Sequence, residues 1–494
     1  MKILLISTPS RRASMVPPLG LLQVAAILEN LGHEPHIYDP LVPDANKDRY
    51  GKNIDDLISN FRPDIVGFGG IATSYGEARK YALYIRNFNH KLKQIAGGPL
   101  SSVSQLLLKE AGLDAVVHGE AEVSLPILLN VFENRADLRD VPGISFMADG
   151  TEIVRNKPAH QVDDLDSLPL PAYHYVNLPA YFRRYKKSIT EFIESLDSKD
   201  HLKYIYDRVG EDDRWIEVMT SRGCTHRCLF CYRHMKGIRY FSADYVIKHI
   251  KYLNHNYGIR GFQFSDELFN GDISRVYEIC DAIVRYGLDI FYTIGGARVD
   301  KVDEEMLLRL KQTGCVEINY GYESGSDTIL KEYRKGVSSQ QNRNITLLTT
   351  KKIGLICPVQ IVIGAPAETD ETIRETIQFL KDVDAYNHSL NYLIPLPETP
   401  IWDYVEKNQL IDNVGEYLNK VARFGGQPII NLTQASNAKW YNWGYKIRAA
   451  LQIHYIRKKG FNLKKIFRLF RLMVIIALPY RMKVKIIGLL RNRT

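Results

Sequence analysis

Residues 224–231 read Cys224-Thr-His-Arg-Cys228-Leu-Phe-Cys231, so three of the chain's six cysteines lie within eight residues. The segment follows a strand-like run at 215–220 and a glycine, which predicts a loop at the end of a strand. Three thiolates on one loop can hold three corners of a cubane iron–sulfur cluster. The fourth iron then has no protein ligand and stays open to a substrate or cosubstrate.

Zinc is the alternative metal for this loop, since His234 would complete a Cys3His site. Three buried structural cysteines at this density are the least favoured interpretation. Cationic neighbours such as Arg222, Arg227 and Lys236 favour thiolate over thiol and would stabilise an anionic cluster. The spacing of the three cysteines favours iron–sulfur over zinc.

The residues before this loop alternate between strand and helix patterns. Strand patterns lie at 2–7, 35–39, 64–70, 94–99 and 115–120, with helical periodicity at 21–31 and 77–87. This alternation predicts a doubly wound, Rossmann-like α/β sheet, in which the carboxyl ends of the strands form a ligand crevice. The loops there are rich in Pro, Gly, Ser and Thr, as the close approach of a large ligand requires. No G-x-G-x-x-G follows the first strand, which argues against a nicotinamide cofactor.

The chain divides by pattern into four parts. We expect an α/β domain at 1–160, a linker and charged helical insertion at 161–214, strand–helix units at 215–400 and a mostly helical region at 401–494. The net charge of +9 belongs to the end of the chain. Residues 457–494 carry 12 Lys/Arg and no Asp/Glu, and without them the net charge is −3. A slightly acidic body argues against nucleic-acid binding.

With Phe230 directly before the last cysteine, the loop resembles the signature of radical S-adenosylmethionine enzymes. Later segments resemble successive strands of that superfamily's barrel, at 261–269, 291–300, 316–326, 359–369 and 391–400. The resemblance implies a partial (β/α)6 barrel and a [4Fe-4S] cluster on Cys224, Cys228 and Cys231. It also implies a set of S-adenosylmethionine-binding residues, namely Phe230, Glu267, Arg298, Glu323 and Gly364, with Asp266 as the alternative to Glu267.

The N-terminal part resembles the cobalamin-binding domain that precedes the barrel in class B radical methyltransferases and in the anaerobic magnesium-protoporphyrin monomethyl ester cyclase family. The similar stretches are 17–39, 63–70, 96–99 and 116–122. No D-x-H motif occurs there, so the usual histidine ligand to cobalt is missing. A vestigial domain that binds nothing is the alternative. The resemblance assigns these residues to cobalamin: Pro18, Thr73, Ser74, Gly97, Gly98, Gly119 and Glu120.

The activity implied by the resemblance is radical cleavage of S-adenosylmethionine, with methylcobalamin supplying a methyl group to an unactivated carbon. A ring-forming or oxidative cyclase-type reaction is the alternative, and a non-enzymatic cobalamin- or zinc-binding regulator is the alternative from another class. An electron donor such as flavodoxin or ferredoxin is the expected partner. No residue is assigned to catalysis beyond those that hold the cofactors.

The C-terminal tail mixes cations with large apolar residues, as in KKIFRLFR at 464–471. This composition predicts either an amphipathic helix pair at an anionic membrane surface or a helix packed on the barrel, with RNA contact third. Membrane docking would suit a small lipophilic substrate such as a lipid or tetrapyrrole. We expect a cytoplasmic protein, peripheral at the inner face of the membrane. The aromatic group at 440–445 is expected to pack in the core, with the lining of a substrate pocket as the alternative.

Overall fold

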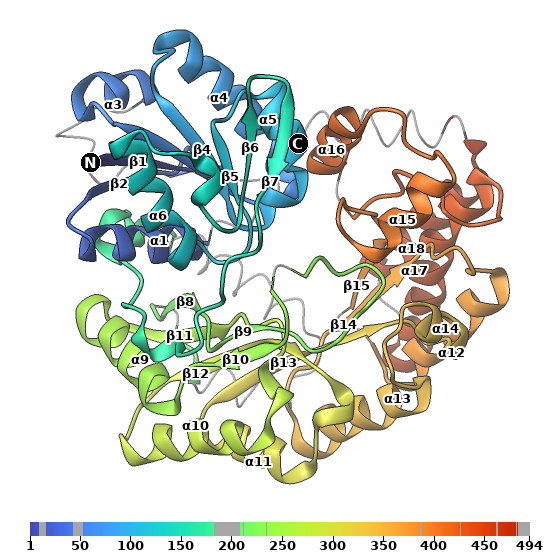
Figure 1. Ribbon diagram of the computed structural model, residues 1–494. Coiled ribbons are helices and arrows are strands. Elements are labelled where there is room, and N and C mark those ends of the chain that lie inside the picture. The colour runs from blue at the N-terminus through green and yellow to red at the C-terminus, as the bar shows by residue number, and fades with distance from the viewer. Residues whose placement is uncertain are drawn as a thin grey trace.

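The computed structural model contains two parallel sheets and a helical C-terminal region (Figure 1). It describes residues 1–8, 16–42, 53–181, 208–210, 212–233, 235–385, 388–424, 426–460, 463–480 and 482. The N-terminal sheet lies above the second sheet in Figure 1, and the C-terminal helices flank both. The charged insertion lies mainly at 182–207, outside the described residues, as does His234.

The N-terminal sheet confirms the doubly wound prediction. Its strand order is β2-β1-β3-β4-β5-β6-β7, and the first five are parallel. The strands are β1 (Lys2–Ser7), β2 (Glu34–Tyr38), β3 (Ile65–Gly69), β4 (Lys93–Gly97), β5 (Ala115–Val117), β6 (Ile144–Ala148) and β7 (Glu152–Arg155). The order reverses between β1 and β3, and the crevice at such a switch point is where open α/β sheets bind ligands.

Successive side chains of β1 point to opposite faces of the sheet and are buried in two different hydrophobic cores. Ile3 and Leu5 pack with α1 (Leu19–Asn30) and α6 (Ala121–Asn134). Leu4 and Ile6 pack on the other face with α3 (Ile54–Phe61), α4 (Tyr75–Phe88) and α5 (Ser104–Glu110). Because both faces of the sheet are covered, its strands are apolar throughout and its polar loops gather at the ends.

Two antiparallel strands at the edge of this sheet escaped the sequence analysis. β6 and β7 form a hairpin whose turn contains Asp149 and Gly150, both with positive φ, at 50° and 74°. An Asp-Gly pair between two short apolar runs is a strong hairpin signal. That signal was present in the sequence, but the β7 pattern is too polar to stand out.

The second sheet is a six-stranded, all-parallel, curled half-barrel, as expected. Its order is β15-β14-β13-β12-β11-β8. The strands are β8 (Arg214–Val218), β11 (Ile259–Phe264), β12 (Phe291–Ala297), β13 (Cys315–Glu323), β14 (Val359–Ile363) and β15 (His388–Tyr392). The helices between them are α9 (Ala243–Tyr257), α10 (Ile273–Arg285), α11 (Glu304–Gln312), α12 (Asp327–Glu332), α13 (Ser339–Leu347) and α14 (Asp370–Asp382).

The C-terminal region joins the two sheets. It contains α15 (Pro400–Lys407), α16 (Val414–Phe424), α17 (Asn437–Lys459) and α18 (Leu463–Ala477). α16 packs against α4 of the N-terminal sheet, where a Cβ on Gly76 would collide with the side chain of Asn419. α17 packs on α14 and on α18. Within the described parts of the chain, every helix is too short or too polar to cross a bilayer.

Candidate active site at the three-cysteine loop

The cysteine loop begins and ends in a small hairpin. β9 (Ser221–Gly223) pairs antiparallel with β10 (Ile238–Tyr240). Gly223 has φ +86°, and a Cβ there would lie 2.4 Å from the carbonyl oxygen of Gly237, so only glycine closes the hairpin.

Two contacts dock the cysteine loop on the segment after α12. The amide of Leu229 donates to the carbonyl of Tyr333 at 3.0 Å. Phe230 meets the Tyr333 ring edge-on, with centroids 5.1 Å apart. These contacts fix the loop over the carboxyl end of the barrel.

The thiols of Cys228 and Cys231 are neighbours on this loop, and the charge of Cys228 also acts on Cys224. The neighbouring Cys231 thiol lowers the pKa of Cys228, and Cys228 in turn raises the pKa of Cys231. Burial raises the pKa of Cys224. Among the described residues no three His, Cys, Asp or Glu side chains already converge as a metal-binding set. The donor set nevertheless fits three corners of a cubane cluster, because thiolates are its usual ligands.

The cations that face the thiols come from the barrel, and this corrects the sequence interpretation of Arg222. Lys335 and Arg298 both help lower the pKa of Cys228. Arg222 instead forms ion pairs with Glu120 and Glu122 of the N-terminal domain. Nothing in the sequence around Lys335 marked it, since a lone lysine after a short helix is ordinary.

Asp266 and Glu267 have different surroundings. The Asp266 carboxylate accepts hydrogen bonds from the amides of Thr220 at 2.6 Å and Ser221 at 2.8 Å. It therefore holds the hairpin onto the barrel. Burial raises the pKa of Glu267, followed by repulsion from Asp266. Of the two acids, Glu267 is the one whose charge acts on Cys224.

Glu323 ends β13 in a left-handed conformation, with φ 63°. Strained backbone of this kind concentrates at functional sites. Its Oε1 lies 3.3 Å from Nζ of Lys335, and both side chains are nearly buried. A Cβ on Gly321 would lie 2.9 Å from each of these atoms. The Gly-x-Glu segment thus makes room for a buried ion pair beside the cysteine loop.

Arg298 follows β12 and is 8% exposed. Its guanidinium binds Asp300 through Nε at 2.8 Å and Nη2 at 3.0 Å, and donates to the Lys335 carbonyl at 2.6 Å. The side chain of Asn270 bonds to both the amide and the carbonyl of Arg298. Arg298 therefore joins the strand end to the segment that carries Lys335.

Gly364 lies at the end of β14 with φ +98°. A Cβ there would lie 2.9 Å from Nε1 of Trp440, which α17 places over the turn. Trp440 is 3% exposed, and its indole N–H has no acceptor within the described residues. A buried donor without a partner indicates a group that supplies the acceptor. The tight turn and the free donor fit the adenosine end of S-adenosylmethionine, so Trp440 belongs to the core and to the candidate site.

Polar side chains line the concave face of the barrel sheet. Gln263 is in register with Glu217 on one side and with Thr293 on the other, and Thr293 is in register with Glu317. Asn319 donates to Glu317 at 2.7 Å. Burial raises the pKa of Glu317 to about 7. The intervening residues of these strands pack in the helix-facing core, so the polar row faces the interior of the half-barrel.

The carboxyl edge of the N-terminal sheet carries the residues assigned to cobalamin. Gly98 and Gly119 have φ +68° and +74°, which favours glycine at both turns. Gly97 ends β4, and Thr73 lies in the short helix that follows β3. Pro18 caps the start of α1. These turns form an edge whose backbone a flat macrocycle could approach closely, so the residues present fit a corrinoid.

The side chains of two residues assigned to cobalamin, Ser74 and Glu120, bond to other groups of the protein. Ser74 is buried, and its hydroxyl accepts the Ile71 amide at 3.4 Å, so it shapes the loop. Both carboxylate oxygens of Glu120 accept hydrogen bonds, one from Arg222 and the other from Arg239. The edge nevertheless faces the cysteine loop, since Ser101, which follows β4, lies 3.4 Å from the hydroxyl of Tyr232.

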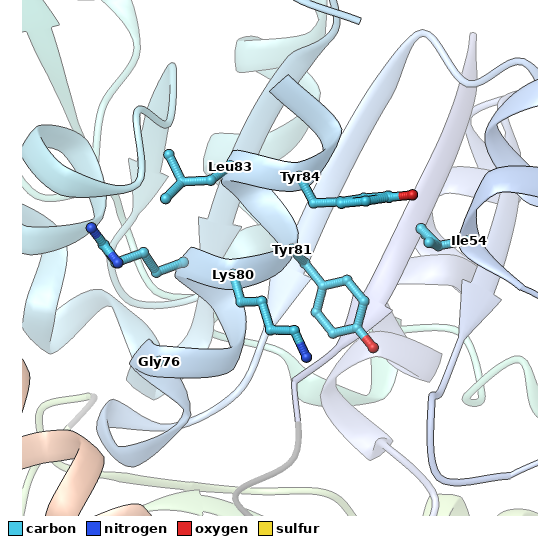
Figure 2. Close-up of a pocket in the computed structure, with 7 residues that line it drawn as sticks. Ile54, Gly76, Lys80, Tyr81, Leu83 and Tyr84 are labelled. Carbon is cyan, nitrogen blue, oxygen red and sulfur yellow. The ribbon is translucent and has the colours of Figure 1, made fainter. Parts of the chain in front are cut away.

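A separate surface cavity of about 530 Å³ lies between α3 and α4, lined in part by Lys80, Tyr81 and Tyr84 (Figure 2). Its lining residues belong to the outer helices of the N-terminal sheet, and none comes from the cysteine loop. We assign it no part in the candidate site.

Comparison with known proteins agrees with this geometry. Residues 218–380 match the Radical SAM superfamily, and residues 10–129 match the B12 binding domain. An uncharacterized methyltransferase of Pyrococcus horikoshii is 30% identical over 423 residues, covering 83% of this chain and 84% of its own. The anaerobic magnesium-protoporphyrin IX monomethyl ester cyclase of a Synechocystis strain is 25% identical, covering 69% of this chain and 65% of its own.

The fold has a solved counterpart. The cobalamin-dependent S-adenosylmethionine radical enzyme OxsB, solved with aqua-cobalamin bound, superposes with a TM-score of 0.68 at 18% identity. The match covers 95% of this chain and 70% of that one. The three-cysteine loop, the half-barrel and the N-terminal sheet, taken with these matches, show that the chain belongs to the radical S-adenosylmethionine enzymes that carry a B12-binding domain.

Proposed function

We propose that this enzyme transfers a methyl group to an unactivated carbon of a small organic substrate. The proposal rests on one observation. A single loop presents three thiols beside the Glu323–Lys335 ion pair, and the carboxyl edge of the N-terminal sheet, which carries the residues assigned to cobalamin, faces that same loop. The P. horikoshii relative, named as a methyltransferase and 30% identical, supports methylation over the cyclase-type alternative.

The residues divide into three groups by task. Cys224, Cys228 and Cys231 would hold the [4Fe-4S] cluster and leave one iron for the amino and carboxylate groups of S-adenosylmethionine. Glu323 and Arg298 would orient its methionine and ribose ends, and Gly364 with Trp440 would receive its adenosine. When bound, the cluster supplies an electron and cobalamin supplies a methyl group, while the protein positions the groups and excludes water.

The substrate itself is proposed from the barrel interior. Glu217, Gln263, Glu317 and Asn319 offer hydrogen-bond donors and acceptors along one row of the concave face. A substrate that enters this half-barrel would displace water from this polar row, and polar groups on the substrate would compensate for that loss better than apolar ones. We therefore propose that the part of the substrate inside the barrel is polar.

The test is a product analysis with methyl-labelled S-adenosylmethionine, cobalamin, a reductant such as reduced flavodoxin, and a small-metabolite extract. Methylation predicts a labelled product together with 5′-deoxyadenosine and S-adenosylhomocysteine. Deoxyadenosine without S-adenosylhomocysteine would contradict it and favour a cyclase-type reaction. Zinc in place of iron, with neither product, would favour the regulator.

We also propose that α18 docks on an anionic membrane surface, which would bring the enzyme to a substrate with a lipophilic part such as a lipid or tetrapyrrole. Phe467 and Phe470 on this helix are 66% and 64% exposed, and Met473 is 52% exposed. The charge of 457–494 is wholly basic, which suits acidic headgroups. Flotation with phosphatidylglycerol vesicles at low salt tests this proposal. Binding that Phe467→Ser with Phe470→Ser abolishes supports it, and no binding by the unaltered protein contradicts it.

A further inference from the structure

Two arginines stand opposite each other at the base of the cysteine loop. Arg222 of β9 and Arg239 of β10 are direct partners in the antiparallel register of the hairpin. Their side chains are 11% and 15% exposed. Like charges on directly opposed strand positions repel each other, so this pair needs an anion to hold it together.

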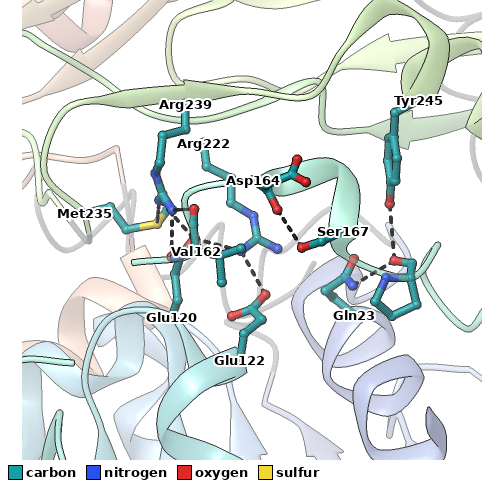
Figure 3. A network of polar contacts seen from close by, with 11 residues as sticks. Gln23, Glu120, Glu122, Val162, Asp164, Ser167, Arg222, Met235, Arg239 and Tyr245 are labelled. Atoms are coloured by element: carbon teal, nitrogen blue, oxygen red, sulfur yellow. Dashed lines mark hydrogen bonds and ion pairs between the residues drawn. The ribbon is translucent and has the colours of Figure 1, made fainter. Parts of the chain in front are cut away.

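Glu120 of the N-terminal domain supplies that anion (Figure 3). Its Oε1 lies 2.8 Å from Nη1 of Arg222, and its Oε2 lies 2.8 Å from Nη1 of Arg239. Nη2 of Arg239 adds a second bond, to Oε1, at 2.9 Å. The amide of Val162 in the interdomain linker donates to Oε2 at 2.8 Å. One carboxylate, 2% exposed, therefore joins the corrinoid domain, the linker and both strands of the hairpin.

The surroundings keep this carboxylate charged. Burial alone would raise the pKa of Glu120, but hydrogen bonds from Arg239 and Arg222 outweigh it and leave that pKa below its usual value. Glu122 pairs with Arg222 as well, at 2.8 Å, whereas Glu120 is the one carboxylate in the described part of the chain that pairs with both arginines. If the Glu120 charge is removed, two nearly buried cations lose the anion that they share, which is strongly unfavourable.

The other side of the hairpin is fixed to the barrel. Asp266 accepts the amides of Thr220 and Ser221. Arg275 of α10 donates to the carbonyls of Thr220 and Phe241, which flank the hairpin. The hairpin that carries the three cysteines is thus held by the barrel on one side and by Glu120 on the other. Glu120 itself lies just after β5, at the carboxyl edge of the N-terminal sheet.

We propose that Glu120 is a positioning residue which, through Arg222 and Arg239, holds the cysteine loop in fixed register with the corrinoid-binding edge. It replaces the cobalamin contact that the sequence resemblance implied for this residue. Its consequence for methyl transfer rests on the proposed function, whereas the mechanical link between the two domains does not.

The test compares Glu120→Gln, which keeps the shape and removes the charge, with two controls. Glu120→Asp keeps the charge on a shorter side chain, so it should behave more like the unaltered protein than Glu120→Gln does. Arg155→Gln removes another interdomain ion pair, Arg155–Glu398 at 3.0 Å, in which the arginine side chain is 57% exposed, and should change nothing.

The first readout is hydrogen–deuterium exchange in the protein loaded with cluster. Glu120→Gln should speed exchange at 221–223 and 238–240 by about tenfold, since a ~1.4 kcal/mol change in a local opening equilibrium corresponds to a factor of ten. The iron content should stay as in the unaltered protein. Unchanged exchange in Glu120→Gln would overturn the proposal. If Glu120→Gln yields no folded protein, Glu120→Asp and Arg239→Lys carry the same measurement.

The second readout is the ratio of methylated product to 5′-deoxyadenosine. A loop held out of register should still cleave S-adenosylmethionine but should deliver fewer radicals to productive transfer, so the ratio should fall about tenfold. A parallel fall in both products would show general damage and count against positioning. If the unaltered enzyme methylates nothing, the proposed function fails, and the exchange experiment still decides the role of Glu120.

Discussion

Nζ of Lys335 lies 3.3 Å from Oε1 of Glu323, and this ion pair is buried beside the cysteine loop. The lysine side chain is 8% exposed and the glutamate side chain 12%. At this depth a pair is sensitive to the loss of either partner, because the remaining charge has little water to solvate it. The pair also connects a residue that the family pattern identifies, Glu323, with one that it does not.

Replacing Lys335 by Met should weaken S-adenosylmethionine binding by about tenfold or more, since Glu323 would lose the cation that orients it. Anaerobic equilibrium dialysis on protein with a full complement of iron measures this. Lys331→Met is the matched control, because Lys331 lies four residues earlier, on α12, and is exposed. Equal affinities in the two variants would remove Lys335 from the site.

Gly364→Ala should destabilise the protein by about 1–3 kcal/mol and weaken S-adenosylmethionine binding. The new methyl group would meet the Trp440 indole, and φ +98° is unfavourable for any residue with a Cβ. Urea denaturation measures the free energy of unfolding. The control is Gly20→Ala, at an open position in the first turn of α1, which should be neutral or stabilising by about 0.5 kcal/mol. Equal effects at the two positions would contradict the described turn.

Alanine at Cys224, Cys228 or Cys231 should each abolish cluster retention, while Cys280→Ala should keep it. Cys280 is buried on α10 and accepts a weak hydrogen bond from Thr313, far along the chain from the loop. Its loss should lower stability by about 1–2 kcal/mol through a small cavity, without loss of iron. Iron and sulfide analysis after anaerobic reconstitution decides the matter. Iron retained by a Cys228→Ala variant would count against the assigned ligands.

Stability should fall as the pH drops below about 6.5, partly because of His249. This histidine is buried against Tyr173, whose hydroxyl lies 3.0 Å from Nε2, and burial lowers its pKa to about 4. In the unfolded chain His249 takes up a proton near pH 6.5, whereas in the folded chain it stays neutral down to about pH 4. Stability therefore rises with pH between about 4 and 6.5. The contribution between pH 7.5 and 5 is about 2 kcal/mol. Melting curves of His249→Gln should show a smaller fall over this range, and an equal fall would contradict the assignment.

Much of the fold could be predicted because its signals are local. The five parallel strands of the first sheet are continuous apolar runs, and the helical periodicity at 21–31 and 77–87 corresponds to α1 and α4. Such patterns follow from burial of both faces of a parallel sheet. The β6–β7 hairpin was missed because its second strand is polar and lies at the sheet edge.

The site could be predicted only where spacing along the chain encodes it. Three cysteines on one loop are visible in sequence, as is the Gly-x-Glu segment with Glu323. Lys335 and Trp440 were not assigned to the site, because only the tertiary fold brings α17 and the segment after α12 to the cysteine loop and the β14 turn. The ion pairs of Glu120 with Arg222 and Arg239 could not be predicted for the same reason, since the two arginines lie about a hundred residues away in sequence.

Electron paramagnetic resonance of the anaerobically reconstituted and reduced protein, with and without S-adenosylmethionine, examines whether the three thiols hold a cluster with one open iron. The structure and its family predict about four iron per chain and a [4Fe-4S] signal that changes when S-adenosylmethionine is added, both lost in the triple alanine variant of Cys224, Cys228 and Cys231. Zinc at the loop, or a cluster signal that S-adenosylmethionine leaves unchanged, would contradict the assignment.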